Sequence, residues 1–111
     1  WRILADRMLA GALDRASYWP STTHWAGLLL WRTEPFHEVV ITAPNAKIVA
    51  NAQHALQAHY RPQAFYAGGA SENIPLLRDR QLGELAIFVC EDGRCQLPVA
   101  SVEKAAEFLK Q

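Results

Sequence analysis

The sequence predicts a small α/β fold, in which a mixed sheet holds a βαβ unit and a C-terminal β-hairpin plus helix. A helical hairpin is expected to precede this sheet. Three patterns predict the arrangement: apolar residues at helical spacing near the N-terminus, a strand–helix–strand pattern in the middle, and an Asp-Gly pair between two short strands near the C-terminus. The chain has 111 residues, of which half are hydrophobic, so it can bury a core.

The N-terminal segment predicts two helices. The first is expected over 2–17, and Pro20 ends it because proline lacks a donor and restricts the preceding residue. Ser21 or Thr22 can cap the second helix, which Pro35 closes. The apolar positions at helical spacing are Ile3, Leu4, Met8, Leu9, Ala12, Leu13 and Ala16, followed by Trp25, Leu28 and Leu29.

The middle of the chain predicts the βαβ unit. Short β-branched or aromatic runs at 38–42 and 63–67 indicate strands, and the apolar stripe between them indicates a helix over 45–60. Asn45 is the expected N-cap and Pro62 follows the helix. Because the connections are short, the two strands are expected to be parallel with a right-handed crossover.

The C-terminal third predicts the hairpin. A strong strand pattern at 84–90 and a short one at 95–99 flank Asp92-Gly93, which favours a type I′ turn. Pro98 cannot donate a backbone hydrogen bond, so the return strand should lie at a sheet edge. The last helix is expected over 101–110 with Ser101 as its cap, and residues 70–83 are expected to be a polar excursion.

Composition excludes several classes of protein. Lys and Arg (11) balance Asp and Glu (11), which argues against a nucleic-acid partner and against a disordered tail. The longest apolar run, Ala26–Trp31, is far shorter than the ~20 residues of a membrane span. No secretory signal pattern is visible, so we expect a cytoplasmic protein and no membrane partner. The helical start at Trp1 suggests a piece of a longer chain.

The two cysteines are the candidate redox residues. The Asp92-Gly93 turn places Cys90 opposite Cys95 in a non-hydrogen-bonded pair, where Cα atoms lie about 4.5 Å apart. Three interpretations remain open. The favoured one is a pair of buried, reduced thiols, because free cysteine behaves as a small hydrophobe. The others are a labile bridge that exchanges with another domain's thiols, and a metal site, which would need two more ligands.

No other residues form a convincing site, and no catalytic residue, cofactor or metal is expected. The turn from Thr42 to Asn45 lacks a nucleotide-binding pattern. The scattered histidines are expected to be solvated or packed, and three helical tryptophans are expected in a core or an interdomain seam rather than a sugar-stacking platform. These residues are His24, His37, His54 and His59, and Trp19, Trp25 and Trp31.

Three segments carry a resemblance to a known family. The V-C-x₄-C-x-x-P-V pattern of residues 89–99 resembles the C-terminal signature of the spermatogenesis-associated, thioredoxin-domain-containing family. Ile74-Pro75-Leu76-Leu77 is similar to that family's I-P-L-L segment, and Glu38-Val39-Val40-Ile41 to its first C-terminal strand. The three segments occur in the family's order and cover roughly residues 36–110.

The resemblance implies a multidomain parent with a thioredoxin-like domain and a central helical toroid. That toroid is similar to the N-acylglucosamine 2-epimerases and the six-hairpin glycosidases. Residues 1–34 would end the toroid and residues 35–111 would form the C-terminal α/β domain. Any sugar-directed or redox activity of the parent would lie mainly outside this chain.

Two functions follow as expectations. The leading one is a non-catalytic accessory domain that packs on the toroid, with the parent's remaining domains as partners and a homo-oligomer formed through the exposed helical hairpin. The alternative is a thiol–disulfide module in which Cys90 and Cys95 exchange electrons with the thioredoxin-like domain. A separate sugar- or nucleotide-binding role has the least support.

Overall fold

The computed structural model describes residues 1–15, 20, 23–70 and 73–110 and confirms the α/β class. The chain divides into two compact units, Trp1–Pro35 and Phe36–Gln111. This division falls one residue after the expected boundary at 34. Among the described residues, none of the helices is long and apolar enough to cross a membrane.

The first unit contains two contacting helices, α1 (Arg2–Asp14) and α2 (Thr23–Thr33). They are joined by a forked ion pair, in which the Arg32 guanidinium donates to the two carboxylate oxygens of Asp6 at 2.7 and 3.0 Å. The expected capping residues Ser21 and Thr22 lie outside the described residues, as does the end of the expected first helix at 16–17.

Little apolar surface is buried in this unit. Leu9 is buried, whereas Ile3 is 71% exposed and Met8 is 57% exposed. Two helices share only one seam, so most of their apolar side chains have no neighbour to pack against. Short helices gain most of their stability from such packing. The first unit therefore presents an exposed apolar surface.

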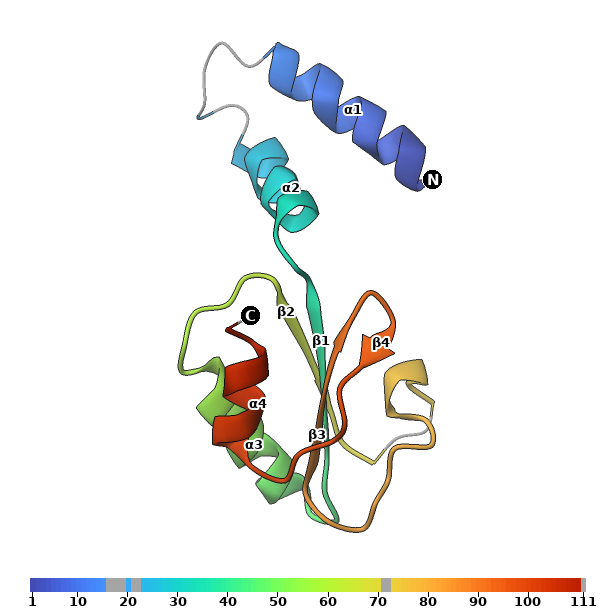
Figure 1. Ribbon diagram of the computed structural model, residues 1–111, viewed down its shortest axis with the longest axis vertical. Helices are drawn as coiled ribbons and strands as arrows, with labels where there is room; N and C mark the ends of the chain where they lie inside the picture. The colour runs from blue at the N-terminus through green and yellow to red at the C-terminus, as the bar shows by residue number, and fades with distance from the viewer. Residues whose placement is uncertain (16–19, 21–22, 71–72, 111) are drawn as a thin grey trace. The chain divides into compact units, whose positions relative to one another are not determined.

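The second unit is built on a four-stranded mixed sheet of order β2-β1-β3-β4 (Figure 1). The strands are β1 (His37–Thr42), β2 (Ala64–Gly68), β3 (Ala86–Glu91) and β4 (Arg94–Cys95). β1 and β2 are parallel and are linked through α3 (Ala46–Gln57), which confirms the βαβ unit. β3 runs antiparallel to both β1 and β4. This leaves β4 at an edge, as Pro98 predicts.

The main core lies between the sheet and two helices, α3 and α4 (Val102–Phe108), which lie side by side (Figure 1). Side chains alternate along a strand, so every second residue of β1 and β3 points into this core. The buried members are Val39, Ile41, Ala43, Val49, Ala52, Leu56, Ile87, Val89, Ala105 and Leu109. The apolar stripe predicted along 45–60 includes Ile48 and Tyr60, but both are exposed, so the buried part of the stripe is narrower than predicted.

Gly68 permits the close approach of β2 to α3. A Cβ at this position would lie 2.5 Å from Cγ1 of Val49, which is buried and stiff about χ1. Gly68→Ala is therefore expected to lower the free energy of unfolding by about 1–3 kcal/mol. Urea unfolding tests this. Gly27→Ala is the control, because a Cβ there meets nothing within 4 Å. Equal stability of Gly68→Ala and the wild-type chain would contradict the prediction.

The opposite face of the sheet is covered by the segment expected to be a polar excursion. A 3-10 helix, η2 (Pro75–Leu77), places Leu77 on this face with no exposed surface. The Thr42 hydroxyl donates to the Arg80 carbonyl oxygen at 2.9 Å, which anchors the following loop to β1. The sequence predicts only a polar connection at 70–83, whereas this segment packs on the sheet as a second layer.

The return strand is shorter than the expected 95–99. β4 ends at Cys95, the Gln96 N–H still donates to the Val89 carbonyl, and the next paired residue is Val99, which exchanges two backbone hydrogen bonds with Ile87. Leu97 and Pro98 consequently lie opposite the single residue Phe88, as in a β-bulge. Proline cannot donate to the ladder, which explains the interruption at this point.

Ser101 caps α4, as predicted, and its side chain binds two groups. Its oxygen accepts from the Lys104 N–H at 3.4 Å, and its hydroxyl donates to the Glu103 carboxylate. The hydrogen bond from Ser101 lowers the pKa of Glu103 below its ordinary value of 4.5, and a backbone hydrogen bond adds to this effect. A lowered pKa in the folded state means that the carboxylate contributes stability above the unfolded-state pKa.

Glu103 should therefore stabilise the fold at neutral pH and lose that contribution as pH falls below 4.5 and passes its lowered folded-state pKa. Glu103→Gln is expected to be less stable than the wild-type chain at neutral pH and equally stable in strong acid. Urea unfolding across this pH range measures the difference. Glu107→Gln, on the same helix, is the control. A gap between Glu103→Gln and wild type that persists in strong acid would contradict the assignment.

Candidate functional site

The turn at the end of the β3–β4 hairpin has the expected geometry. Asp92 has φ 48° and Gly93 has φ 77°, so both central residues have positive φ, as a type I′ turn requires. Glu91 pairs with Arg94, and Cys90 pairs with Cys95. The predicted register is confirmed.

The two cysteines form a disulfide. Their sulfurs are 2.08 Å apart and their Cα atoms are 3.9 Å apart. The Gln96 N–H donates to the Val89 carbonyl at 2.9 Å, so the neighbouring Cys90–Cys95 pair occupies the non-hydrogen-bonded position. The favoured expectation of two reduced thiols is therefore wrong. The register brings the side chains close enough to bond.

The two sulfur-bearing residues differ in exposure. Cys90 is only 1% exposed, because it lies on β3 between β1 and β4. Cys95 is exposed, because it lies on the two-residue edge strand. The expectation that both cysteines are buried holds for Cys90 and is wrong for Cys95. An external thiol therefore reaches one end of this disulfide more readily than the other.

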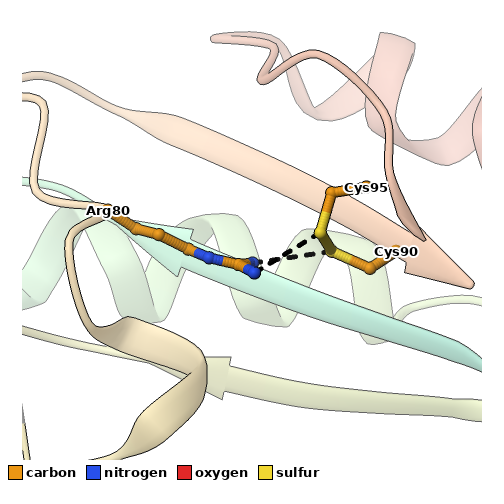
Figure 2. Close-up of a disulfide and its surroundings, with 3 residues drawn as sticks. All are labelled: Arg80, Cys90 and Cys95. Atoms are coloured by element: carbon orange, nitrogen blue, oxygen red, sulfur yellow. Dashed lines mark hydrogen bonds between the residues drawn. A yellow bond between two sulfur atoms is a disulfide. The ribbon is translucent and has the colours of Figure 1, made fainter. Parts of the chain in front are cut away.

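Arg80 contacts both sulfurs (Figure 2). Its Nη1 lies 3.5 Å from Sγ of Cys90, and its Nη2 lies 3.4 Å from Sγ of Cys95. The guanidinium carbon is 5.1 Å from the centroid of the Phe88 ring, a cation–π distance. The stacking and the bond from Thr42 to the Arg80 carbonyl hold the arginine over this face of β3.

This arrangement of Arg80 beside the two sulfurs favours a negatively charged thiolate over a neutral disulfide. A neutral disulfide is a weak hydrogen-bond acceptor, whereas a thiolate accepts a charge-assisted bond from a guanidinium. A cation beside a cysteine stabilises its thiolate form. Arg80 therefore binds the reduced or partly reduced site more strongly than the oxidised site.

A small hollow of about 50 Å³ lies near the same hairpin end. His37 lines this hollow, and its Nδ1 atom is buried with no hydrogen-bond partner among the described residues. Glu91 and Arg94 contribute opposite charges to its wall. The full set of lining residues is His37, Val89, Cys90, Glu91, Arg94, Gln96 and Phe108.

The other residues considered from the sequence are not brought together. His24 and His54 are exposed on α2 and α3, and His59 is exposed beyond the end of α3. Trp25 is half-buried, Trp31 is exposed, and Trp19 lies outside the described residues. Within the part of the chain that the structure describes, no group of three or more His, Cys, Asp or Glu side chains could hold a metal ion.

Arg80 is the site residue that sequence reasoning missed. It lies ten residues before Cys90, in a segment that was expected to be only a polar connection. The sequence does indicate that this segment packs against the core, because a polar stretch there contains the apolar group Ile74-Pro75-Leu76-Leu77. Nothing local to Arg80 shows where its side chain goes.

No family model matches the chain, and no curated protein or solved structure matches it.

Proposed function

We propose that residues 36–110 form an accessory α/β domain whose Cys90–Cys95 disulfide takes part in thiol–disulfide exchange with a dithiol partner. The contact of Arg80 with both sulfurs is the observation that carries the proposal. The resemblance described above supplies the candidate partner, a thioredoxin-like domain in the parent protein.

The position of the bridge argues against a purely structural role. The cysteines are five residues apart in sequence, and a type I′ turn already closes the loop between them. A disulfide stabilises mainly by restricting the unfolded chain, and for so short a loop the chain-entropy model gives only about 2 kcal/mol. The bridge would add little to a hairpin that its own turn already specifies.

The surroundings of the bridge favour exchange. Cys95 is exposed, so a partner thiolate has access, and Arg80 can neutralise the thiolate that reduction releases. Exposed disulfides are the ones most often labile or catalytic. We also propose a cytoplasmic location, where bridges that form are usually transient and catalytic or redox-sensing.

The reduction potential tests this function. Oxidised protein is equilibrated in thiol–disulfide buffers, and its free thiols are counted by alkylation and mass spectrometry. We expect a potential between about −270 and −180 mV, the range of thioredoxin and protein disulfide isomerase. A value below about −300 mV is typical of structural disulfides and would rule the proposal out. The Cys90→Ser/Cys95→Ser double variant is the control for retention of the fold.

The exposed apolar surface of α1 and α2 supports a second role, as a docking element. This role agrees with the expectation that residues 1–34 end a helical toroid in the parent. Amide hydrogen exchange tests it by comparing this chain with the full-length parent. We expect α1 and α2 to exchange fast in the chain alone and slowly in the parent. Equal rates would rule out packing on the toroid, and sedimentation of the chain alone tests for a homo-oligomer.

A further inference from the structure

We infer that the exchange has a fixed order: the partner thiolate attacks Sγ of Cys95, and Cys90 leaves as the thiolate held by Arg80. The inference also assigns the partner's form, a cysteine on an extended peptide segment that pairs with the β4 edge. It rests on the proposed function and adds the order of attack and the class of partner.

Access decides which sulfur is attacked. A thiolate approaches a disulfide along the S–S axis, from the side opposite the sulfur that leaves. Cys95 is open to this approach, because β4 is the edge strand and residues 91–98 are all exposed. Cys90 is closed to it, because Cys90 lies on β3 between β1 and β4 and is 1% exposed.

Charge reinforces this order. Glu38 on β1 pairs in register with Cys90, and the two side chains share one face of the sheet. A carboxylate there repels an incoming thiolate. Arg80 does not choose between the sulfurs, since it contacts both, but its Nη1 group at 3.5 Å is ready to neutralise Cys90 once that sulfur is released.

The hydrogen-bonding pattern of the hairpin indicates the form of the partner. In a non-hydrogen-bonded pair the backbone N–H and C=O groups point away from the neighbouring strand. Those of Cys95 therefore point to the open edge, where an extended segment can add as a further strand. Leu97, which is 85% exposed, offers an apolar contact beside them. The bulge at Leu97-Pro98 and the turn at Asp92-Gly93 limit the pairing to a short stretch.

The chemistry balances as a two-electron exchange. The partner's first thiolate forms a bond to Sγ of Cys95, the Cys90–Cys95 bond breaks, and its electron pair leaves on Cys90. The partner's second thiolate then attacks the partner sulfur of the mixed disulfide and releases the Cys95 thiolate. The partner dithiol ends as a disulfide, Cys90 and Cys95 end reduced, and the pH of the solution sets how many of their thiolates take up protons.

The order of attack is tested on the oxidised wild-type chain. The probe is a synthetic peptide with one central cysteine flanked by valines. The reaction is stopped with acid, free thiols are alkylated, and trypsin cleaves after Arg94, which separates Cys90 from Cys95. We expect the peptide adduct on Cys95 and the alkyl group on Cys90, in about tenfold excess or more, because thiol chemistry follows access.

The outcomes separate the two proposals. Adducts on Cys90, or on both cysteines equally, overturn the order of attack while a potential in the exchange range leaves the proposed function standing. If no redox buffer reduces the disulfide, both the proposed function and the order of attack are wrong. A second peptide, N-methylated beside its cysteine, tests the partner's form. It should react severalfold more slowly, and an equal rate overturns the edge pairing.

Discussion

Replacing Arg80 with glutamine is expected to lower the reduction potential of the Cys90–Cys95 disulfide by about 30–60 mV. Hydrogen bonds to charged groups contribute about 1.5–3 kcal/mol, and for a two-electron couple 30 mV corresponds to about 1.4 kcal/mol. Arg80 is half-buried, so solvent screens part of its charge and the lower end of the range is expected. The glutamine variant loses the charge that stabilises the reduced site and therefore becomes harder to reduce.

The same substitution should slow reduction by about tenfold, because the leaving thiolate loses its cation. Arg80→Lys keeps the charge but loses the forked contact with two sulfurs, so it should recover part of both effects. Arg78→Gln is the matched control, since its side chain is exposed in the same segment. The measurements are equilibration in redox buffers and the initial rate with dithiothreitol. If Arg78→Gln and Arg80→Gln behaved alike, the role of Arg80 would be wrong.

This test separates a direct role of Arg80 from a structural one. The bond from Thr42 goes to the Arg80 backbone carbonyl, so the loop keeps its anchor when the side chain changes. Loss of the stacking on Phe88 is a structural effect that would appear as lower stability in urea. A change in potential without a matching change in stability of the reduced protein identifies the electrostatic contribution.

Ile87→Ala is expected to cause the largest loss of stability, lowering the free energy of unfolding by about 3–4 kcal/mol. The Ile87 side chain has no exposed surface and belongs to the core between the sheet and the helices α3 and α4. Its backbone pairs with Ile41 on one side and Val99 on the other, so the cavity cannot close by a shift of β3 alone. Large-to-small substitutions at such sites typically cost about 2–5 kcal/mol.

Urea unfolding of the oxidised chain measures this loss. Leu97→Ala is the control, because Leu97 is exposed and a surface substitution of this kind usually changes stability by about 0.5 kcal/mol or less. A loss below about 1 kcal/mol for Ile87→Ala would contradict the placement of this residue at the centre of the core. Comparable losses for the two variants would do the same.

The elements specified by near neighbours are the ones that sequence patterns predicted well. The type I′ turn requires positive φ at two successive residues, and few pairs other than Asp92-Gly93 adopt it readily. The turn and the Cys90–Cys95 register therefore follow from a short stretch of sequence. Asn45 and Ser101 cap α3 and α4 through bonds to residues two and three positions away. The ends of helices were predicted less accurately, since α3 ends at Gln57 and not at residue 60.

The errors concern contacts between distant segments. Residues 70–83 contain few apolar side chains, yet Leu77 is fully buried, because the face of β1 that carries Val40 needs a cover. The exposure of Cys95 depends on the order of strands, which places β4 at the edge. Neither the burial of Leu77 nor the exposure of Cys95 can be predicted from the neighbouring residues in the sequence.

By itself the sequence determined a mixed α/β unit with a tight hairpin and two cysteines directly opposite each other, because backbone preferences and side-chain alternation act over a few residues. Only the tertiary structure decided that Cys90 is buried, that Cys95 is exposed, and that Arg80 contacts both sulfurs. The physical reason is that strand order sets the exposure of the two cysteines, and packing of the η2 segment and the loop after it sets the position of Arg80. Both join residues that no short sequence pattern relates.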